Sequence, residues 1–228
     1  SAPSTSRSFS SKASVVERPR LPSLLFDSLE NGEENDLVVG RTHDCVAFTD
    51  IDLARERLVD RDLIECLITN AKLDDTDLQG SRMRETRLEG CEATAIKMSR
   101  TELREVEFVG CRFGALEMYD ARARMLHLRD CRLGYVNLRG AELIDVTFTN
   151  CTIADLDLGG ARVERLALPG CRVDSLILGD GSLKDVDLRG SEFQEITGIE
   201  ALSGVTISPD QLHDLAPLLA SHLGIDIA

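Results

Sequence analysis

A five-residue repeat governs residues 46–193 of this chain of 228 residues. From Phe48 to Phe193 every fifth residue is apolar, which gives thirty consecutive units. A helix turns about 100° per residue, so a five-residue repeat would spread its apolar positions around the whole helix surface. A long strand is excluded as well, because side chains alternate with a period of two and an odd repeat would change face at each unit. The pattern therefore predicts a solenoid of short strands joined by corners.

The inward residue two places before each central residue determines the cross-section of the coil. Small residues recur there every twenty positions, as Ala71, Cys91, Cys111, Cys131, Cys151, Cys171 and Ser191. A second small ladder lies ten positions away, and larger apolar residues fill the two ladders between them. Four units per coil explain this order, with small walls facing each other and large walls facing each other. A triangular coil of fifteen residues would mix the ladders, so we expect a square coil of about seven and a half turns.

Individual units resemble those of the pentapeptide-repeat family, in which a small or apolar residue is followed by Asp or Asn and then by Leu or Phe. Examples are Ala141-Glu-Leu-Ile-Asp, Val136-Asn-Leu-Arg-Gly and Val186-Asp-Leu-Arg-Gly. The resemblance implies an all-β fold for residues 46–196, a right-handed quadrilateral β-helix closed by an N-terminal cap and a C-terminal α-helical cap. It implies less about function, because one fold hosts many functions.

Five of the seven cysteines belong to the small ladder, one per coil. Neighbouring coils lie about 4.8 Å apart, which a disulfide can span. Parallel side chains in a packed core are poorly aimed at each other, however, so we expect reduced thiols that act as small buried hydrophobes. The chain has no Cys-x-x-Cys pair and no histidine spacing typical of a zinc site. We therefore expect neither a metal ion nor a cofactor.

The N-terminal region precedes the regular repeat. Residues 1–20 are rich in Ser and are expected to form a flexible or extended arm. Residues 21–45 are the candidate N-terminal cap, with a helix over residues 22–30 and a strand at residues 37–39. Within the first coil, Glu56 and Arg61 occupy inward positions, where a lone buried charge is costly. They either pair with each other or turn outward, and we favour the outward arrangement.

The C-terminal segment, residues 197–228, is predicted to form a cap helix and a dimerisation module. Ser208, Pro209 and Gln211 provide an N-cap, a first-position proline and a residue that returns the capping bond. Gly224 ends the helix, and Pro217 predicts a kink or break within it. One apolar helix face is needed to cover the end of the coil, and the surplus indicates a second copy of the chain. We assign the dimer interface to Gln211, Leu212, Leu215, Leu219, Leu223, Gly224, Ile225 and Ile227.

The charge of the chain is strongly acidic and unevenly distributed. The net charge is −14 overall; residues 82–139 have 12 basic and 9 acidic residues, whereas residues 140–228 have 5 basic and 15 acidic residues. Free nucleic acid is an improbable ligand, since nucleic-acid binding normally requires a basic patch. No apolar run approaches the roughly 18 residues of a membrane span, and no signal peptide is visible. We expect a cytoplasmic protein without a membrane partner or a small-molecule substrate.

Two outward ladders carry stacked charge. Arg82, Glu102, Arg122, Glu142 and Arg162 alternate in sign, so that each residue can pair with the coils above and below it. A second ladder, the Arg84, Arg104 and Arg124 stripe, has a single sign. Like charges at one-coil spacing repel each other. The stripe is therefore either neutralised by neighbouring glutamates or kept for an acidic partner.

No arrangement of residues predicts an enzyme, because the sequence shows no nucleophile–histidine–acid set, no phosphate-binding glycine loop and no metal spacing. A second resemblance concerns the C-terminus. Residues 204–211, Gly-Val-Thr-Ile-Ser-Pro-Asp-Gln, followed by Leu223-Gly-Ile225, resemble the C-terminal end of the Qnr and MfpA types of quinolone-resistance pentapeptide proteins. That resemblance implies a homodimer whose acidic double rod imitates DNA and binds DNA gyrase. The chain has no loops that interrupt its coils, so it is nearer to the loop-free MfpA type.

Carried over by position, the resemblance assigns a partner-binding acidic surface near the two-fold axis. Its residues are Asp145, Asp155, Asp157, Asp174, Asp185 and Asp187. The positive charge of the Arg84, Arg104 and Arg124 stripe is opposite to that of DNA phosphates, and it weakens the mimicry of DNA away from the axis. The alternative hypothesis is therefore a structural or protein-interaction scaffold with another partner.

Overall fold

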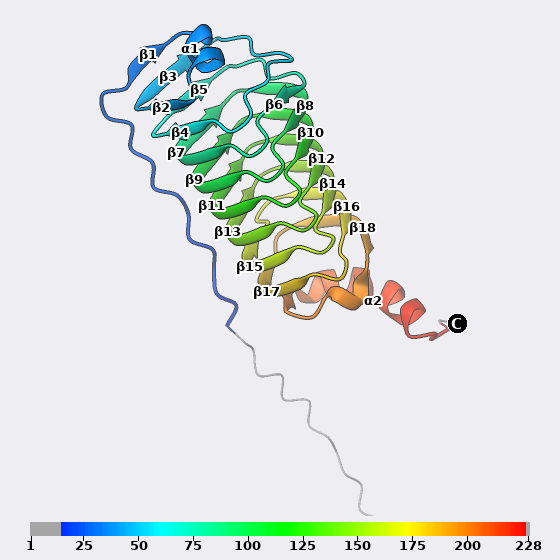
Figure 1. The fold of residues 1–228 in the computed structure, drawn as a ribbon. Coiled ribbons are helices and arrows are strands. Elements are labelled where there is room, and N and C mark those ends of the chain that lie inside the picture. Colours follow the sequence, from blue (N-terminus) through cyan, green and yellow to red (C-terminus); the bar gives the residue numbers. More distant parts are fainter. Residues whose placement is uncertain (1–14, 227–228) are drawn as a thin grey trace, which may run out of the picture.

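Residues 15–226 are described by the computed structural model, in which the repeat region and the segments that flank it form a right-handed β-helix of about nine turns. All strands pair in parallel, each with the strand one coil away, and they build two sheets that run the length of the rod (Figure 1). The 12-stranded sheet contains β1 (Glu30–Gly32), β2 (Thr42–Asp44), β3 (Val46–Thr49), β4 (Asp62–Ile64), β5 (Leu67–Thr69), β7 (Arg82–Glu89), β9 (Glu102–Val109), β11 (Arg122–Arg129), β13 (Glu142–Thr149), β15 (Arg162–Ala167), β17 (Ser182–Asp187) and β19 (Val205–Thr206). The 7-stranded sheet contains β6 (Thr76–Asp77), β8 (Glu92–Lys97), β10 (Arg112–Glu117), β12 (Arg132–Asn137), β14 (Thr152–Asp157), β16 (Arg172–Ile177) and β18 (Glu192–Thr197).

The register of the sheets confirms four repeat units per coil. Leu126 of β11 pairs with Val106 on one side and with Val146 on the other, in each case twenty residues away. The expectation of seven and a half turns was too low. β1 pairs with β3 before the first regular unit, and β19 pairs with β17 after the last. Segments outside the repeat therefore extend the same sheet at both ends.

The core is a single cluster that fills the coil. The central residue of most units is almost fully buried; Phe48, Phe108 and Phe148 are at most 1% exposed. The cysteine ladder is equally buried, as expected for one small wall of the square. Leu37 and Leu215, which lie outside the repeat at the two ends of the rod, join the same cluster. Both caps therefore complete the core.

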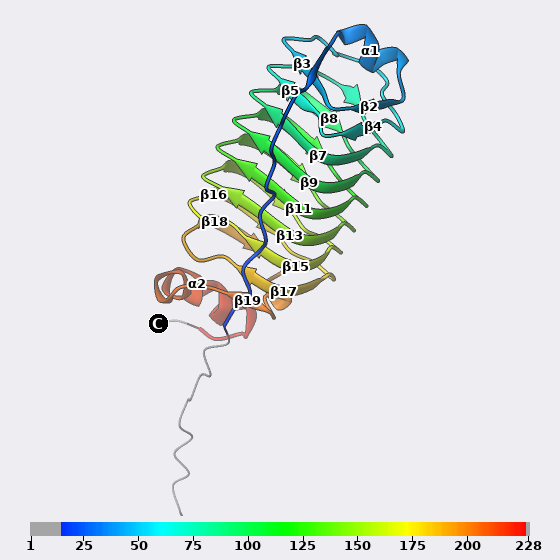
Figure 2. The ribbon, with the colours of Figure 1, turned by 90° about the vertical axis from the view of Figure 1, so that its left-hand side faces the viewer.

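The N-terminal cap differs from the expectation. The predicted helix at residues 22–30 is absent, and residues 15–29 instead run extended along the rod (Figure 2). The helix forms at the predicted strand, as α1 (Glu34–Val39). The side chains of Glu33 and Asp36 make reciprocal capping bonds to the helix N-terminus, and Leu37 is buried in the core. A capping box and one buried leucine thus outweigh the β-propensity of the valines.

The charge of Arg61 in the first coil is neither paired with Glu56 nor simply turned outward, the two arrangements expected from the sequence. The residue is half-buried, and its guanidinium donates hydrogen bonds to the carbonyl oxygens of Leu37, Val38 and Val59. Two of these carbonyls belong to the last turn of α1, where helix carbonyls lack partners within the helix. Arg61 therefore joins the N-terminal cap to the coil, and it pairs neither with Glu56 nor with solvent alone.

At the other end of the rod, a 3₁₀ turn, η1 (Ile199–Ala201), leads through β19 to α2 (Pro209–His222). The predicted capping box of α2 is present: Gln211 N–H donates to Ser208 Oγ at 3.2 Å, and Ser208 N–H donates to Gln211 Oε1 at 2.8 Å. Pro217 lies inside the helix without breaking it. Within residues 15–226 no helix has both the length and the apolar character needed to cross a bilayer.

Candidate functional site

The apolar residues of the C-terminal helix fall into a buried group and an exposed group. Leu215 and Leu219 pack on the core of the last coil. The side-chain amide of Gln211 donates hydrogen bonds to the carbonyl oxygens of Leu188 and Ser191, at 2.6 and 2.8 Å. These contacts tie α2 to the end of the last coil, where the Leu188 carbonyl also accepts the Ser191 N–H at 3.3 Å. Gln211, Leu215 and Leu219, assigned to a dimer interface from the sequence, thus close the end of their own rod.

The remaining apolar residues of this segment are exposed. The exposed fractions are 50% for Leu212, 40% for Leu218, 71% for Leu223 and 56% for Ile225. Gly224 adopts a left-handed conformation, with φ of +69°, and the Ile225 N–H donates to the Ala220 carbonyl at 2.8 Å. Ile227 lies outside the described residues. We call Leu212, Leu218, Leu223 and Ile225 the exposed apolar face of the C-terminal segment.

The six aspartates assigned to the acidic surface lie on both sheets. Asp145, Asp185 and Asp187 belong to β13 and β17, whereas Asp155, Asp157 and Asp174 belong to β14 and β16. Two of them are buried: Asp145 is 3% exposed and Asp157 is 4% exposed. The structure therefore does not bring the six carboxylates together as one exposed surface.

Asp157 is fixed by donors in its own coil and in the preceding coil. Its carboxylate accepts hydrogen bonds from the Gly159 N–H at 2.9 Å and the Tyr135 hydroxyl at 3.1 Å, and it forms an ion pair with Arg139 at 3.3 Å. Burial and the bond to this carboxylate raise the pKa of Tyr135. Asp187 is held similarly, by a two-pronged pair with Arg189 at 2.8 and 2.7 Å. Both aspartates support the fold.

Asp145 and Asp185 contact the N-terminal arm, residues 15–29. The Arg20 N–H donates to Asp145 Oδ1 at 3.1 Å, and the Glu17 N–H donates to Asp185 Oδ1 at 3.3 Å. Asp145 also pairs with Arg165 at 2.6 Å. Burial raises the pKa of Asp145, but the hydrogen bonds from Arg165 and Arg20 outweigh it, so the pKa is lowered overall. The arm thus crosses the strands of the larger sheet along the rod (Figure 2).

The exposed carboxylates of the C-terminal end were not singled out from the sequence. Asp155 and Asp174 are half-exposed, but other acidic side chains are more accessible. Within residues 15–226, the following exposed acids form no ion pair: Asp180, Glu192, Glu195, Glu200, Asp210 and Asp214. They lie on β18, on η1, on α2 and in the loop before β17. The sequence did contain a signal for these free charges. Glu195 has Ser175, not a basic residue, at the position one coil away, and only Glu192 has an arginine there, Arg172.

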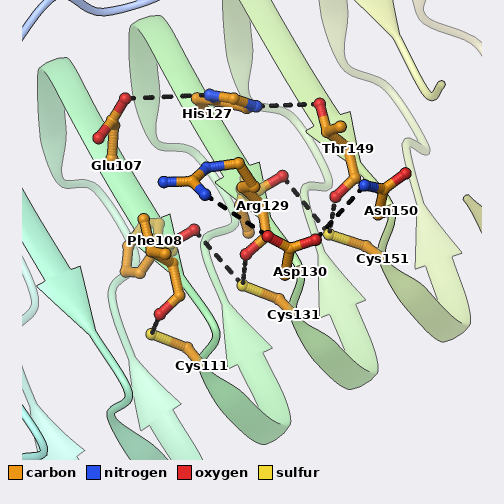
Figure 3. Close-up of polar contacts among 12 residues, drawn as sticks. Glu107, Phe108, Cys111, His127, Arg129, Asp130, Cys131, Thr149, Asn150 and Cys151 are labelled. Atoms are coloured by element: carbon orange, nitrogen blue, oxygen red, sulfur yellow. Dashed lines mark hydrogen bonds and ion pairs between the residues drawn. The ribbon is translucent and has the colours of Figure 1, made fainter. Parts of the chain in front are cut away.

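The arm also covers a polar row near the N-terminal half of the rod. Arg87 lies over the ring of Phe26, 5.3 Å from its centroid, and pairs with Glu107 at 2.7 Å. Glu107 faces His127 Nδ1 at 3.9 Å, and His127 Nε2 contacts Thr149 Oγ1 at 2.9 Å (Figure 3). Burial lowers the pKa of His127, against the opposing effect of Glu107. The row therefore holds a neutral imidazole beneath the surface.

All seven cysteines are free thiols. In the ladder, each Sγ donates to backbone carbonyls, as Cys131 does to Arg129 at 3.3 Å and to Phe108 at 3.5 Å (Figure 3). Outside the ladder, the Cys45 thiol donates to the carboxylates of Asp44 and Glu65. The bond to Asp44, then burial and the bond to Glu65, raise the pKa of Cys45 to about 11. The thiol and the two carboxylates thus form one hydrogen-bonded cluster.

Comparison with known proteins supports the assignment of the fold. Residues 61–138 and 101–178 match the family described as "Pentapeptide repeat region" and together span about half of the chain. No curated protein sequence matches the chain. A trypsin-treated form of QnrB1, a plasmid-mediated fluoroquinolone resistance protein, is 19% identical, with 82% of this chain and 99% of that chain covered and a TM-score of 0.35.

Full-length QnrB1 is 18% identical over 81% of this chain and 100% of its own, with a TM-score of 0.36. HetL, from the cyanobacterium Nostoc sp. strain PCC 7120, is a pentapeptide repeat protein involved in the regulation of heterocyst differentiation. It is 17% identical over 71% of this chain and 90% of its own, with a TM-score of 0.39. The chain belongs to the pentapeptide-repeat family, as the match of residues 61–178, the uninterrupted repeat and the square parallel coil show.

Proposed function

We propose that this chain is a non-enzymatic binding protein that dimerises through its C-terminal segment and imitates duplex DNA for DNA gyrase. The observation that supports the proposal most is the coincidence of two features at one end of the rod. The exposed apolar face of the C-terminal segment lies beside the exposed acids of β18, η1 and α2. An apolar face that joins two copies brings two sets of these acids together.

Dimerisation accounts for the exposed leucines. Large apolar side chains that cluster on the surface mark protein-contact sites, and a two-fold contact needs one self-complementary patch. Gln211, Leu215 and Leu219 would support the interface from within, while Leu212, Leu218, Leu223 and Ile225 would make the contact. With about nine turns at a spacing of about 4.8 Å, two rods joined end to end are about 80 Å long or more.

The charge of the C-terminal half accounts for the partner. Residues 140–228 carry a net charge of −10, and a dimer doubles it around the axis. DNA presents one phosphate charge per about 1.7 Å of helix axis. Among the described residues, the exposed acids Glu192, Glu195, Glu200, Asp210 and Asp214 form no ion pair, and Asp155 and Asp174 lie at the edge of the same surface.

A supercoiling assay with purified gyrase tests this proposal. The wild-type protein is expected to inhibit supercoiling at low salt. The triple variant Glu192→Gln, Glu195→Gln and Glu200→Gln is expected to inhibit more weakly while it keeps the same melting temperature. A matched control, Glu30→Gln, Glu89→Gln and Glu92→Gln, removes three exposed acids from the other half and is expected to inhibit like the wild type. Equal inhibition by both variants would contradict the assignment of the surface.

The second candidate function is a protein-interaction scaffold. It is favoured by the charge of residues 82–139, which have a net charge of +3. If the protein neither binds gyrase nor inhibits it at low salt, the scaffold hypothesis replaces DNA mimicry.

A further inference from the structure

The Arg84, Arg104 and Arg124 stripe forms a continuous column of positive charge. The three residues pair in register through β7, β9 and β11, and all three side chains are exposed. Within residues 15–226, Arg84 and Arg124 have no carboxylate within ion-pair distance. Arg104 has one partner, Glu105, at the long distance of 3.9 Å. Neighbouring glutamates therefore leave most of the charge of the stripe unpaired.

The ladder beside the stripe differs, because its charges are paired along the rod. Arg82 binds Asp62 at 2.7 Å. Arg122 lies 3.6 Å from both Glu102 and Glu142. Between this neutralised ladder and the stripe lies a groove of about 600 Å³, whose floor is formed by the buried residues Leu63, Met83, Leu103 and Ala123. The groove thus has one neutral wall and one cationic wall.

Apolar residues end the cationic wall on both sides. Ile64 of β4 pairs with Arg84, and Ile144 of β13 pairs with Arg124. Both isoleucines line the groove and are half-buried. The wall therefore reads isoleucine, three arginines, isoleucine over five consecutive coils. At about 4.8 Å per coil, the two isoleucines are about 19 Å apart along the rod.

We propose that this groove binds an extended acidic segment of a partner protein, with an apolar residue at each end. In an extended peptide, side chains on one side recur every second residue, about 6.7 Å apart. Three such steps span about 20 Å, which matches the distance between the isoleucines. The complementary segment has seven residues, with apolar side chains at positions 1 and 7 and Asp or Glu at positions 3 and 5. Arginine binds carboxylates in a two-pronged geometry, which favours this chemistry.

The same observations favour a peptide over a nucleic acid. The phosphates of a nucleic acid would extend beyond the three arginines, and those outside the stripe would be repelled by a protein of net charge −14. A short segment with two carboxylates is matched to the length of the stripe, and its apolar residues use Ile64 and Ile144. The other sheet also carries stacked arginines, Arg112 and Arg132. Glu92, Asp74 and Asp174 line the shallow groove there, so it lacks the apolar ends.

Fluorescence anisotropy with a labelled synthetic peptide tests this inference. The probe has Leu at positions 1 and 7, Glu at positions 3 and 5, and Ser at the remaining positions. The wild-type protein is expected to bind it, and the variant Arg84→Gln, Arg104→Gln and Arg124→Gln to bind at least tenfold more weakly. The control Arg112→Gln, Arg132→Gln and Arg172→Gln removes the same charge from the other sheet and is expected to bind like the wild type.

Two further probes separate charge from shape. A peptide with Gln at positions 3 and 5, and one with Leu moved from positions 1 and 7 to positions 2 and 6, are both expected to bind at least tenfold more weakly. Equal loss of binding in the two arginine variants would overturn the inference, as would no binding by the wild type. Displacement of the peptide by a single-stranded oligonucleotide at equal concentration would overturn it in favour of nucleic acid. None of these results depends on gyrase.

Discussion

Arg165 and Asp145 form an ion pair across one coil, with Nε 2.6 Å from Oδ1. The pair joins β15 to β13 beneath the N-terminal arm. The same carboxylate oxygen accepts the Arg20 N–H, and Arg165 also lies 3.7 Å from Glu17. The ion pair is therefore the point at which the arm is attached to the rod, and it withdraws Asp145 from any acidic surface.

Replacing Asp145 is expected to loosen the arm and to destabilise the rod. Asp145→Ala leaves the mostly buried Arg165 without its main partner, which costs about 3 kcal/mol in the free energy of unfolding. Denaturant unfolding measures this cost, and limited trypsin digestion at Arg18 or Arg20 reports release of the arm. Asp174→Ala, which removes a half-exposed aspartate, is the control. Unchanged stability and unchanged digestion of Asp145→Ala would show that the pair does not hold the arm.

The cysteine ladder is expected to tolerate small residues and to reject large ones. Cys131→Ala removes one sulfur atom from the wall and is expected to cost about 1 kcal/mol. Cys131→Leu places a larger side chain against a closely packed backbone and is expected to cost about 1 to 3 kcal/mol more. Thermal unfolding ranks the two variants. If Leu proves the more stable replacement, the wall is not packed as described.

Stability is expected to fall at mildly acidic pH because of His127. Burial holds the pKa of His127 below its ordinary value of 6.5, so the unfolded chain takes up a proton before the folded protein does. The contribution is complete above about pH 6.5 and is lost as the pH falls through the lowered pKa. The difference in unfolding free energy between the wild type and His127→Gln is therefore expected to shrink from pH 7.5 to pH 5. A difference that grows over this range would contradict the assignment of a neutral imidazole.

The exposed apolar face is expected to control the oligomeric state. The double variant Leu223→Asp and Ile225→Asp places charge on the most exposed residues of that face, and light scattering should then give the mass of one 25.0 kDa chain. The wild type and the control Val39→Asp, which changes an exposed residue at the opposite end, should give twice that mass. Monomer mass for the wild type at micromolar concentration would refute the dimer.

The repeat region was predictable because every unit repeats the same physical requirement. A five-residue period excludes helices and flat strands, and the twenty-residue ladders specify a square coil. The register of Leu126 with Val106 and Val146 confirms this reasoning. The capping box of α2 was equally predictable, since its residues are local: Ser208 and Gln211 bond each other in the predicted way.

The N-terminal arm and the acidic surface were harder to predict for different reasons. The arm is held by backbone N–H groups on Asp145 and Asp185, and such contacts leave no pattern in the arm's own sequence. The pair of Asp145 with Arg165 did have a signal, because the two residues are one coil apart. The number of aspartates alone therefore overstates the free charge, because a basic residue twenty positions away can pair with an aspartate, as Arg165 does with Asp145.

Competition for gyrase between this protein and DNA is the most direct test of the proposed mimicry. A fluorescent DNA duplex bound to gyrase is titrated with the protein, and its release is followed by anisotropy. We predict that the wild type displaces the duplex at low salt. About tenfold more protein is expected to be needed once the salt concentration is high enough to screen the exposed charges. The triple variant Glu192→Gln, Glu195→Gln and Glu200→Gln is expected to displace the duplex less effectively. Failure of the wild type to displace the duplex at low salt, at concentrations where it is a dimer, would contradict DNA mimicry.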